Sequence, residues 1–387
     1  MPRTTAGRIA LGVGLGLAAV AVVTSAAAAT LSVVMARKVV VVPRRREEEI
    51  RVLGATPSTI TLSLHDDTIV PGRYGLFFDQ GAGHVRIGDV VEVGVDSVTR
   101  ELLAVDFGDP AMAQRARLSG WYFLHPRELG VVVEDVLLDA PVGQAPAWFV
   151  PARQESSRWA VHVHGRGVTR GETIRDVPVF HAAGYNSLLV SYRNDGVAPD
   201  SGDRRFGLGG TEWRDVEAAL DHAVAHGATD IVLMGWSMGG ATVLQVATRS
   251  RHRHLIRGVV LDSPVVDWRV VLDVQASERS VPMPIRQGAL QLIGSDWGRV
   301  FTGQQERIDL DSMDFVTRAG DLDVPILLLH SADDGYVPAD ASRALSILRP
   351  DIVTYEEFTV ARHAKLWNYD EARWNRVIRE WLDRLSR

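Results

Sequence analysis

Short apolar runs alternate with longer amphipathic segments over most of this chain. Eight runs after residue 130 predict β-strands, at 131–138, 147–150, 159–163, 187–192, 231–234, 258–262, 324–330 and 352–358. Between several of these runs apolar residues recur at helical spacing, most clearly over 212–226, where Gly227 is a typical stop. Repeated strand–helix units specify a mainly parallel sheet covered by helices, so the pattern predicts an α/β domain over 131–387.

The pattern changes to a period of two in the region before this domain. Ile60, Leu62 and Leu64 alternate with polar residues, and Pro71-Gly72 and 81–83 are typical of turns. We therefore predict a linker and a small β-rich module over 39–130, with the module itself at roughly 50–110. It contains no recognisable chemistry, so a stabilising appendage is the simplest interpretation. The alternatives are that it shapes access to an active site or binds a partner.

The N-terminus predicts a membrane segment. Residues 9–36 form a run of 28 residues without a charge, and about 20 apolar residues span a bilayer core. A single-pass transmembrane anchor within 1–38 is favoured, because the apolar character continues past the possible cleavage site at 26–28. The alternative is a secretory signal with its apolar core at 9–23, which would release the protein. Basic residues after the span favour a cytoplasmic body, whereas a signal-like start favours the opposite orientation.

Composition excludes several kinds of protein. The formal net charge of −6 and the absence of a basic stripe in the body of the chain argue against nucleic-acid binding. The chain has no cysteine, which excludes disulfides, thiol nucleophiles, cysteine-bound metals and a lipid-modified N-terminal cysteine. No cofactor is implied, and the sequence identifies no protein partner.

The strand predicted at 231–234 leads directly into Gly235-Trp236-Ser237-Met238-Gly239. A strand that ends in G-x-S-x-G and passes at once into a helix is typical of the nucleophile elbow of a serine hydrolase. Apolar residues at helical spacing do follow, over 241–247. The chain has 35 glycines, so the motif alone could arise by chance, and its place between strand and helix is what favours the elbow.

From about residue 131 to 387 the chain resembles the α/β-hydrolase superfamily, whose catalytic residues follow in the order Ser, Asp or Glu, His. After Ser237, the segment 325–338 is similar to the family's strand-then-acid segment, often written H-G-x-x-D-x-x-V-P, with Ser331 where glycine is common. The resemblance implies Asp334 as the acid. Asp333 beside it and Asp262 at another strand end are the alternatives.

The resemblance also implies the remaining parts of the site. His363 is the only histidine in the loop after the last predicted strand, where the family places its base. The family's oxyanion hole uses the N–H after the nucleophile, here that of Met238. A second N–H comes from a loop similar to His164-Gly165-Arg166-Gly167; Arg166 is the favoured donor and Gly165 the alternative.

Three further residues are predicted to contact substrate: Gly165, Trp236 and Tyr192. All stand at or beside the carboxyl ends of predicted strands, where ligands bind in open α/β sheets. The alternatives for the segment 192–196 are that it holds the catalytic loops in place or forms a structural hydrogen-bonded turn. His162 and His164 form an H-x-H pair, but no carboxylate cluster completes a zinc site, so no metal is predicted.

Residues 269–320 interrupt the strand–helix repeat. They contain Pro282, Pro284 and several short amphipathic pieces, which predict a cap inserted over the active site.

These observations predict a membrane-anchored serine hydrolase that cleaves an acyl bond of a small ester, lipid or peptide through an acyl-serine intermediate. Esterase or lipase-like activity is favoured over a peptidase of the prolyl-oligopeptidase type, because 39–130 is too short for the propeller that usually precedes such a domain. Acyl transfer to another acceptor is an alternative that the sequence does not separate from hydrolysis. A non-catalytic scaffold is a third interpretation, disfavoured by the complete Ser, Asp and His set.

Overall fold

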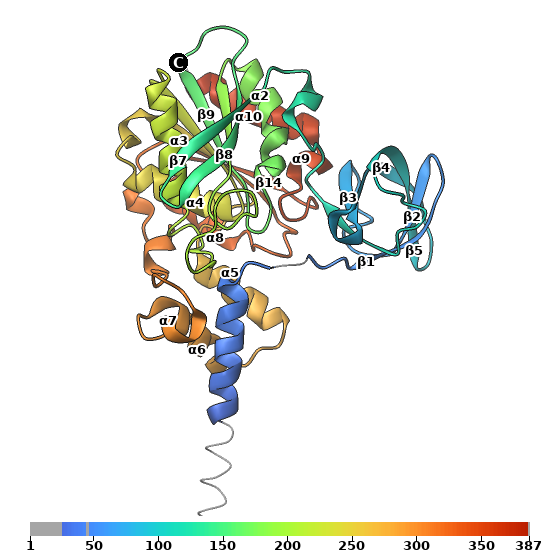
Figure 1. The fold of residues 1–387 in the computed structure, drawn as a ribbon, viewed down its shortest axis with the longest axis horizontal. Helices are drawn as coiled ribbons and strands as arrows, with labels where there is room; N and C mark the ends of the chain where they lie inside the picture. Colours follow the sequence, from blue (N-terminus) through green and yellow to red (C-terminus); the bar gives the residue numbers. More distant parts are fainter. Residues whose placement is uncertain (1–24, 44–45, 386–387) are drawn as a thin grey trace, which may run out of the picture.

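A computed structural model describes residues 25–43 and 46–385, which form a small barrel beside a larger body built on one central sheet (Figure 1). Within these residues the sheet has eight strands in the order β14-β13-β12-β11-β9-β10-β8-β7. Strands β9 to β14 are parallel, whereas β8 and β7 extend one edge antiparallel. The strands are β7 (Glu134–Ala140), β8 (Gly143–Val150), β9 (Arg158–Val163), β10 (Asn186–Val190), β11 (Asp230–Trp236), β12 (Ile256–Asp262), β13 (Ile326–Ser331) and β14 (Val353–Phe358).

Helices cover both faces of this sheet, which explains why its central strands are nearly continuous apolar runs. One face carries α3 (Trp213–Ala225), α4 (Met238–Arg249) and α8 (Asp340–Leu348). The other carries α2 (Val177–Ala182), α9 (Leu366–Tyr369) and α10 (Glu371–Leu385), with a core rich in tryptophan. The predicted α/β architecture with a mainly parallel sheet is confirmed.

The β-rich module is a closed six-stranded barrel in the order β1-β2-β5-β4-β3-β6, as described for residues 46–119. Its strands are β1 (Ile50–Ala55), β2 (Thr59–Ser63), β3 (Tyr74–Phe78), β4 (Gly83–Val93), β5 (Ser97–Phe107) and β6 (Arg115–Ser119). The barrel has its own core, in which Ile60 and Leu62 are buried as their alternation predicts. Leu64 is exposed, because β2 has already ended and the chain has turned into a loop.

A buried arginine shapes the barrel's longest loop, between β2 and β3. The Arg100 side chain is 0% exposed and has no carboxylate partner among the described residues. Its guanidinium instead donates to the backbone carbonyls of Thr68, Val70, Gly72 and Gly88 at 2.7–2.9 Å. Burial lowers the pKa of Arg100. The carbonyls satisfy the charge and hold the β2–β3 loop in one shape, which matters because this loop reaches the candidate site.

The segment predicted to interrupt the repeat lies between β12 and β13 and is largely helical. It contains α5 (Trp268–Glu278), α6 (Met283–Gly294) and α7 (Arg299–Thr302). Figure 1 shows these helices gathered at one end of the body, beside the N-terminal helix.

That N-terminal helix, residues 25–40, lies against this helical segment, for which we keep the name cap as a label only. The Ser32 hydroxyl donates to the Ile285 carbonyl of α6 at 3.2 Å. The approach is so close that a Cβ on Gly288 would stand 2.5 Å from Ser32 Oγ and would displace that hydroxyl. Ala36 and Val40 are 0% exposed and belong to the main core. The end of this helix is therefore part of the folded body.

The predicted membrane span is only partly described. Its residues 9–24 lie outside the described residues, and 25–36 belong to the helix that contacts the cap. Among residues 25–43 and 46–385, no helix combines the length and the apolar character needed to cross a bilayer. In this part of the predicted span Ser32 and Ala36 are buried against the body, whereas Leu31 and Val34 are exposed.

Candidate active site

Ser237 sits at a sharp turn between β11 and α4 with φ 52° and ψ −117°. A positive φ is unfavourable for a residue with a side chain, so the surrounding packing must enforce it. A Cβ on Gly239 would stand 2.2 Å from the Val163 carbonyl oxygen. One on Gly235 would stand 2.6 Å from that of Gly239. Both motif glycines are therefore required for strand and helix to approach, as the elbow interpretation expects.

The structure brings Ser237, His363 and Asp334 together from three different loops. His363 Nε2 lies 2.9 Å from Ser237 Oγ, and His363 Nδ1 lies 2.7 Å from Asp334 Oδ2. The serine follows β11, the acid follows β13 and the histidine follows β14. The order of the three residues along the chain and the two distances are typical of a Ser–His–Asp catalytic triad.

Asp334 is held in its ionised form. Burial acts to raise its pKa, but the charge of His363 and hydrogen bonds from His330 and His363 outweigh burial and keep the pKa well below its usual range. The backbone N–H groups of Tyr336 and Val337 also donate to Asp334 Oδ1, at 2.9 and 2.8 Å. A fixed negative charge against Nδ1 orients the imidazole so that Nε2 faces the serine.

The two alternative acids have other partners. Asp262 is 0% exposed and accepts hydrogen bonds from the Trp374 indole and the Ser263 hydroxyl, at 2.8 and 2.9 Å. Asp333 pairs with Arg362 at 3.1 Å. Neither carboxylate contacts the imidazole, so the geometry favours Asp334.

The loop that carries His363 is fixed by two hydroxyl groups from neighbouring strand ends. Ser331 Oγ accepts the N–H of Ala361 at 3.1 Å, and Ser263 Oγ accepts that of Ala364 at 3.0 Å. Ala364 itself has a positive φ of 54°. Ser331, which stands where glycine is common in the family, therefore has a structural role: its side chain anchors the start of the loop that carries His363.

The glycine-rich loop after β9 lies directly against the serine. A Cβ on Gly165 would be 3.2 Å from the Ser237 Cβ. The Gly165 N–H donates to Glu172 Oε2 at 2.9 Å, so it is engaged and is not available to an oxyanion. The backbone N–H groups of Arg166 and Met238 have no acceptor among the described residues. This difference favours Arg166 over Gly165 as the second donor.

Tyr192 lies beneath this loop and is 0% exposed. Its hydroxyl donates to the Gly165 carbonyl at 2.7 Å, and its ring stacks on His164 at 4.1 Å between centroids. His164 in turn contacts Asp195 at 3.2 Å. The predicted substrate contact of Tyr192 is therefore corrected: it supports the loop from below, because the strand end faces the core there.

Trp236 requires the same correction. It is 0% exposed, donates its indole N–H to Asp176 at 3.0 Å and stacks near Trp374. A residue just before the elbow serine points away from the cleft, since neighbouring strand residues face opposite sides. Of the three predicted substrate contacts, only Gly165 lines the cleft.

The H-x-H pair does not converge on one point with a carboxylate. His162 contacts Asp176 at 3.1 Å, whereas His164 contacts Asp195. The described residues do hold one group with metal-ligand spacing, formed by Glu217, Asp221 and His252, and none of these three lines the cleft. His252 contacts Asp221 at 2.7 Å.

Two family profiles match this chain. The profile of the alpha/beta hydrolase family matches residues 160–377, which include Ser237, Asp334 and His363. The chain belongs to the alpha/beta hydrolase family. A second profile, of a domain of unknown function (DUF8805), matches residues 51–119 and so corresponds to the barrel. No curated protein matches the chain.

Solved structures resemble the hydrolase domain at low sequence identity. Two crystal forms of the Pyrococcus furiosus esterase Pf2001 superpose with a TM-score of 0.52, at 16% and 15% identity. They cover 68% of this chain and 94% and 96% of theirs. An esterase from a Rhodococcus species has a TM-score of 0.46 at 19% identity and covers 65% of this chain and 99% of its own. At such identities the first two establish the fold alone.

The barrel contributes to the cleft of this hydrolase, which agrees with the alternative that the β-rich module shapes access to an active site. The cleft at Ser237 has a volume of about 570 Å³, and its walls include His65, Asp66, Asp67 and Arg117 of the barrel. Asp67 Oδ2 lies 2.9 Å from Lys365 Nζ, and Asp66 lies 3.0 Å from Arg362. These ion pairs fasten the barrel to both sides of His363 in the chain. No pattern within the barrel sequence could have indicated a contact made across the fold.

The rejected acid predicts a pH dependence of stability. Burial raises the pKa of Asp262 to about 7, so the folded protein retains a proton that the unfolded chain loses near its usual pKa. Between these two pKa values the folded state binds more protons, and stability falls as pH rises. We expect Asp262→Asn to remove this loss, so that its stability relative to wild type increases by up to about 4 kcal/mol from pH 4 to pH 7.

Urea unfolding of both proteins at the two ends of this range measures the difference. A stability difference that stays constant with pH would contradict a proton held on Asp262.

Proposed function

We propose that this protein is a serine hydrolase that cleaves ester bonds through an acyl-enzyme. The observation that carries the proposal is the 2.9 Å approach of His363 Nε2 to Ser237 Oγ, with Asp334 2.7 Å from the other ring nitrogen. A serine hydroxyl is a weak nucleophile at neutral pH and needs a base at this distance. The cleft beside it provides room for a substrate.

In the proposed reaction Ser237 Oγ attacks the carbonyl carbon of the ester while His363 accepts the hydroxyl proton. The carbonyl oxygen gains negative charge, which the N–H groups of Arg166 and Met238 would stabilise by about 3 kcal/mol each. His363 then returns the proton to the leaving alcohol as the tetrahedral intermediate collapses. Water, activated by the same imidazole, attacks the acyl-enzyme and releases the carboxylic acid.

Asp334 does not take up the proton in this scheme. Its depressed pKa keeps it charged, so it favours the imidazolium that forms when His363 is protonated. The ester specificity is supported by the structural neighbours, since the Pyrococcus furiosus protein is an esterase. The architecture supports it further. A peptidase of the prolyl-oligopeptidase type usually carries a propeller before its hydrolase domain, whereas this chain has a six-stranded barrel there.

We also propose that the N-terminal segment anchors the protein to a membrane. The support is the uncharged run 9–36, with basic residues on both sides.

Labelling by a fluorophosphonate tests whether Ser237 is an activated nucleophile. We expect the wild-type protein to form one covalent adduct and Ser237→Ala to form none, because only a serine whose proton is accepted by an adjacent base during attack reacts readily with the probe. Intact-mass spectrometry detects the adduct. A folded wild-type protein that stays unlabelled would overturn the proposal in favour of a non-catalytic role.

The two buried aspartates provide a matched test of the acid. Asp334→Asn should lower kcat on a p-nitrophenyl ester by roughly 10⁴-fold, because the neutral amide no longer fixes the imidazole tautomer. Asp262→Asn should stay within about tenfold of wild type, since its carboxylate does not contact His363. The reverse ranking of the two variants would identify Asp262 as the acid.

Fractionation tests the anchor. The full chain should stay in the membrane pellet after alkaline carbonate extraction, because a spanning helix is not released by removing peripheral proteins. Recovery of a soluble form whose N-terminus maps near 26–28 by mass spectrometry would favour the cleaved signal instead.

A further inference from the structure

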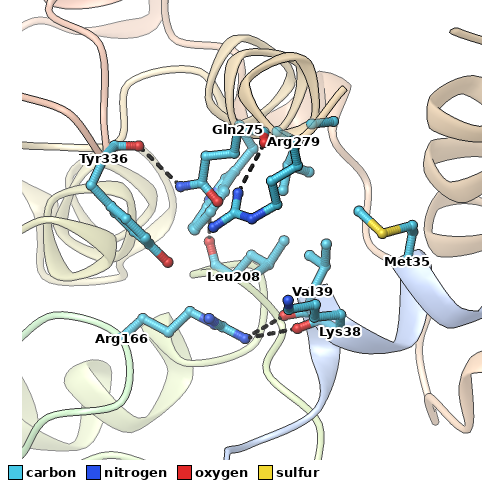
Figure 2. Close-up of a pocket in the computed structure, with 11 residues that line it drawn as sticks. Met35, Lys38, Val39, Arg166, Leu208, Gln275, Arg279 and Tyr336 are labelled. Atoms are coloured by element: carbon cyan, nitrogen blue, oxygen red, sulfur yellow. Dashed lines mark hydrogen bonds between the residues drawn. The ribbon is translucent and has the colours of Figure 1, made fainter. Parts of the chain in front are cut away.

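A second cavity, of about 130 Å³, lies between the N-terminal helix and cap helix α5 (Figure 2). Six of the eleven residues that line it are apolar: Met35, Val39, Leu208, Trp268, Leu272 and Ala276. The other five are polar or charged, namely Lys38, Arg166, Gln275, Arg279 and Tyr336. Met35 and Val39 enter from the N-terminal helix, on the side opposite Tyr336 in the view of Figure 2. The cavity therefore exists only because residues 25–40 dock against the cap.

This cavity adjoins the cleft that contains Ser237. Arg166 and Tyr336 line both spaces, so they stand at the boundary between them. The Tyr336 ring lies 5.1 Å from that of His363. Its carbonyl accepts a hydrogen bond from Gln275 of α5 at 3.0 Å, which holds the cap beside the boundary. A group bound to Ser237 could thus extend past Tyr336 into the apolar cavity.

The cavity also continues away from the cleft. A smaller space of about 40 Å³ shares Met35, Val39, Leu272 and Ala276 with it. Leu290 and Ile293 also line that space, together with the charged Asp273 and Arg286. The two spaces beside the N-terminal helix share lining residues with each other, and the larger one shares Arg166 and Tyr336 with the cleft; we call the two spaces the helix-side passage.

The chemistry of the route differs from that of the rest of the cleft. On the barrel side the cleft is lined by charged groups, including Asp66, Asp67, Arg117 and Lys365. An apolar chain placed there would leave these groups poorly solvated. In the helix-side passage the same chain would bury its methylenes against the apolar side chains of the walls, and each buried methylene strengthens binding.

We propose that the helix-side passage binds the acyl chain of the substrate, so that the preferred substrates are esters of longer, unbranched aliphatic acids. This inference rests on the proposed esterase function and adds the substrate class. The polar leaving alcohol then faces the barrel. The N-terminal helix becomes part of the substrate-binding site of the hydrolase domain.

Arg166 connects this helix to the site of reaction. Its guanidinium donates to the carbonyl of Val39 at 2.7 Å and to that of Lys38 at 3.3 Å, at the C-terminal end of the helix. A cation at this end satisfies free carbonyls and interacts favourably with the helix dipole. The backbone N–H of the same residue is the proposed oxyanion donor. Docking of the helix therefore positions both the wall of the passage and one donor.

Substitution at Ala276 tests the proposal in the full-length protein. Ala276→Trp fills the passage, whereas Val300→Trp places the same side chain at an 85% exposed cap position outside it. The readout is the ratio of kcat/KM for p-nitrophenyl decanoate to that for p-nitrophenyl acetate. We expect the ratio to exceed one in wild type, to fall at least about tenfold in Ala276→Trp and to be unchanged in Val300→Trp.

Binding of decanoate to Ser237→Ala, followed by calorimetry, gives a readout that needs no turnover. Decanoate should bind Ser237→Ala and should bind the Ser237→Ala/Ala276→Trp double variant at least about tenfold more weakly. Should Ala276→Trp fail to fold, Met35→Trp fills the same passage from the opposite wall.

The outcomes separate the two proposals. Fluorophosphonate labelling of wild type with equal kcat/KM for decanoate and acetate would overturn the passage and leave the esterase standing. An equal loss of both activities in Ala276→Trp, with decanoate binding retained, would overturn it as well. Decanoate binding without any labelling or hydrolysis would support the passage as an apolar binding site and overturn the esterase.

Discussion

The active arrangement depends on one backbone conformation, that of Ser237. A residue with φ 52° and ψ −117° would relax if its neighbours allowed it, and the neighbours do not. A Cβ on Gly235 of β11 would stand 2.6 Å from the carbonyl oxygen of Gly239 in α4, and one on Gly239 would stand 2.2 Å from the carbonyl oxygen of Val163 in β9, so only glycine fits at these two contact points. The two hydrophobic cores of the sheet hold these elements in place. The packing of the two cores therefore stabilises the strained backbone at Ser237 and fixes the position of its hydroxyl.

The histidine loop shows the opposite strategy, because it is fixed by polar contacts from several directions. Hydroxyls from β13 and from the end of β12 hold its ends, and the barrel holds its flanks through Asp66 and Asp67. The barrel loop is itself shaped by the buried Arg100. Arg100, which is buried inside the barrel, thus contributes to the position of His363 through the β2–β3 loop.

The place of Gly235-Trp236-Ser237-Met238-Gly239 between a predicted strand and a predicted helix was sufficient to predict the turn at Ser237. Asp334 and His363 were implied by the resemblance to the α/β-hydrolase superfamily, and the structure brings both side chains to Ser237. Tyr192 and Trp236 were misjudged because a strand end has two faces, and the sequence does not show which one meets the cleft. The contributions of Glu172, the barrel and the N-terminal helix arise from contacts between distant segments, for which neither spacing nor periodicity carries a signal.

The close contact between Ser32 and Gly288 has a consequence for how this protein can change over generations. The segment that docks there belongs to the same apolar run that is proposed to set the protein's location. A change in this run selected for a different membrane would also alter a wall of the space beside the nucleophile. The location of the protein in the cell and its preference among substrates would then change together during evolution, because the same residues determine both.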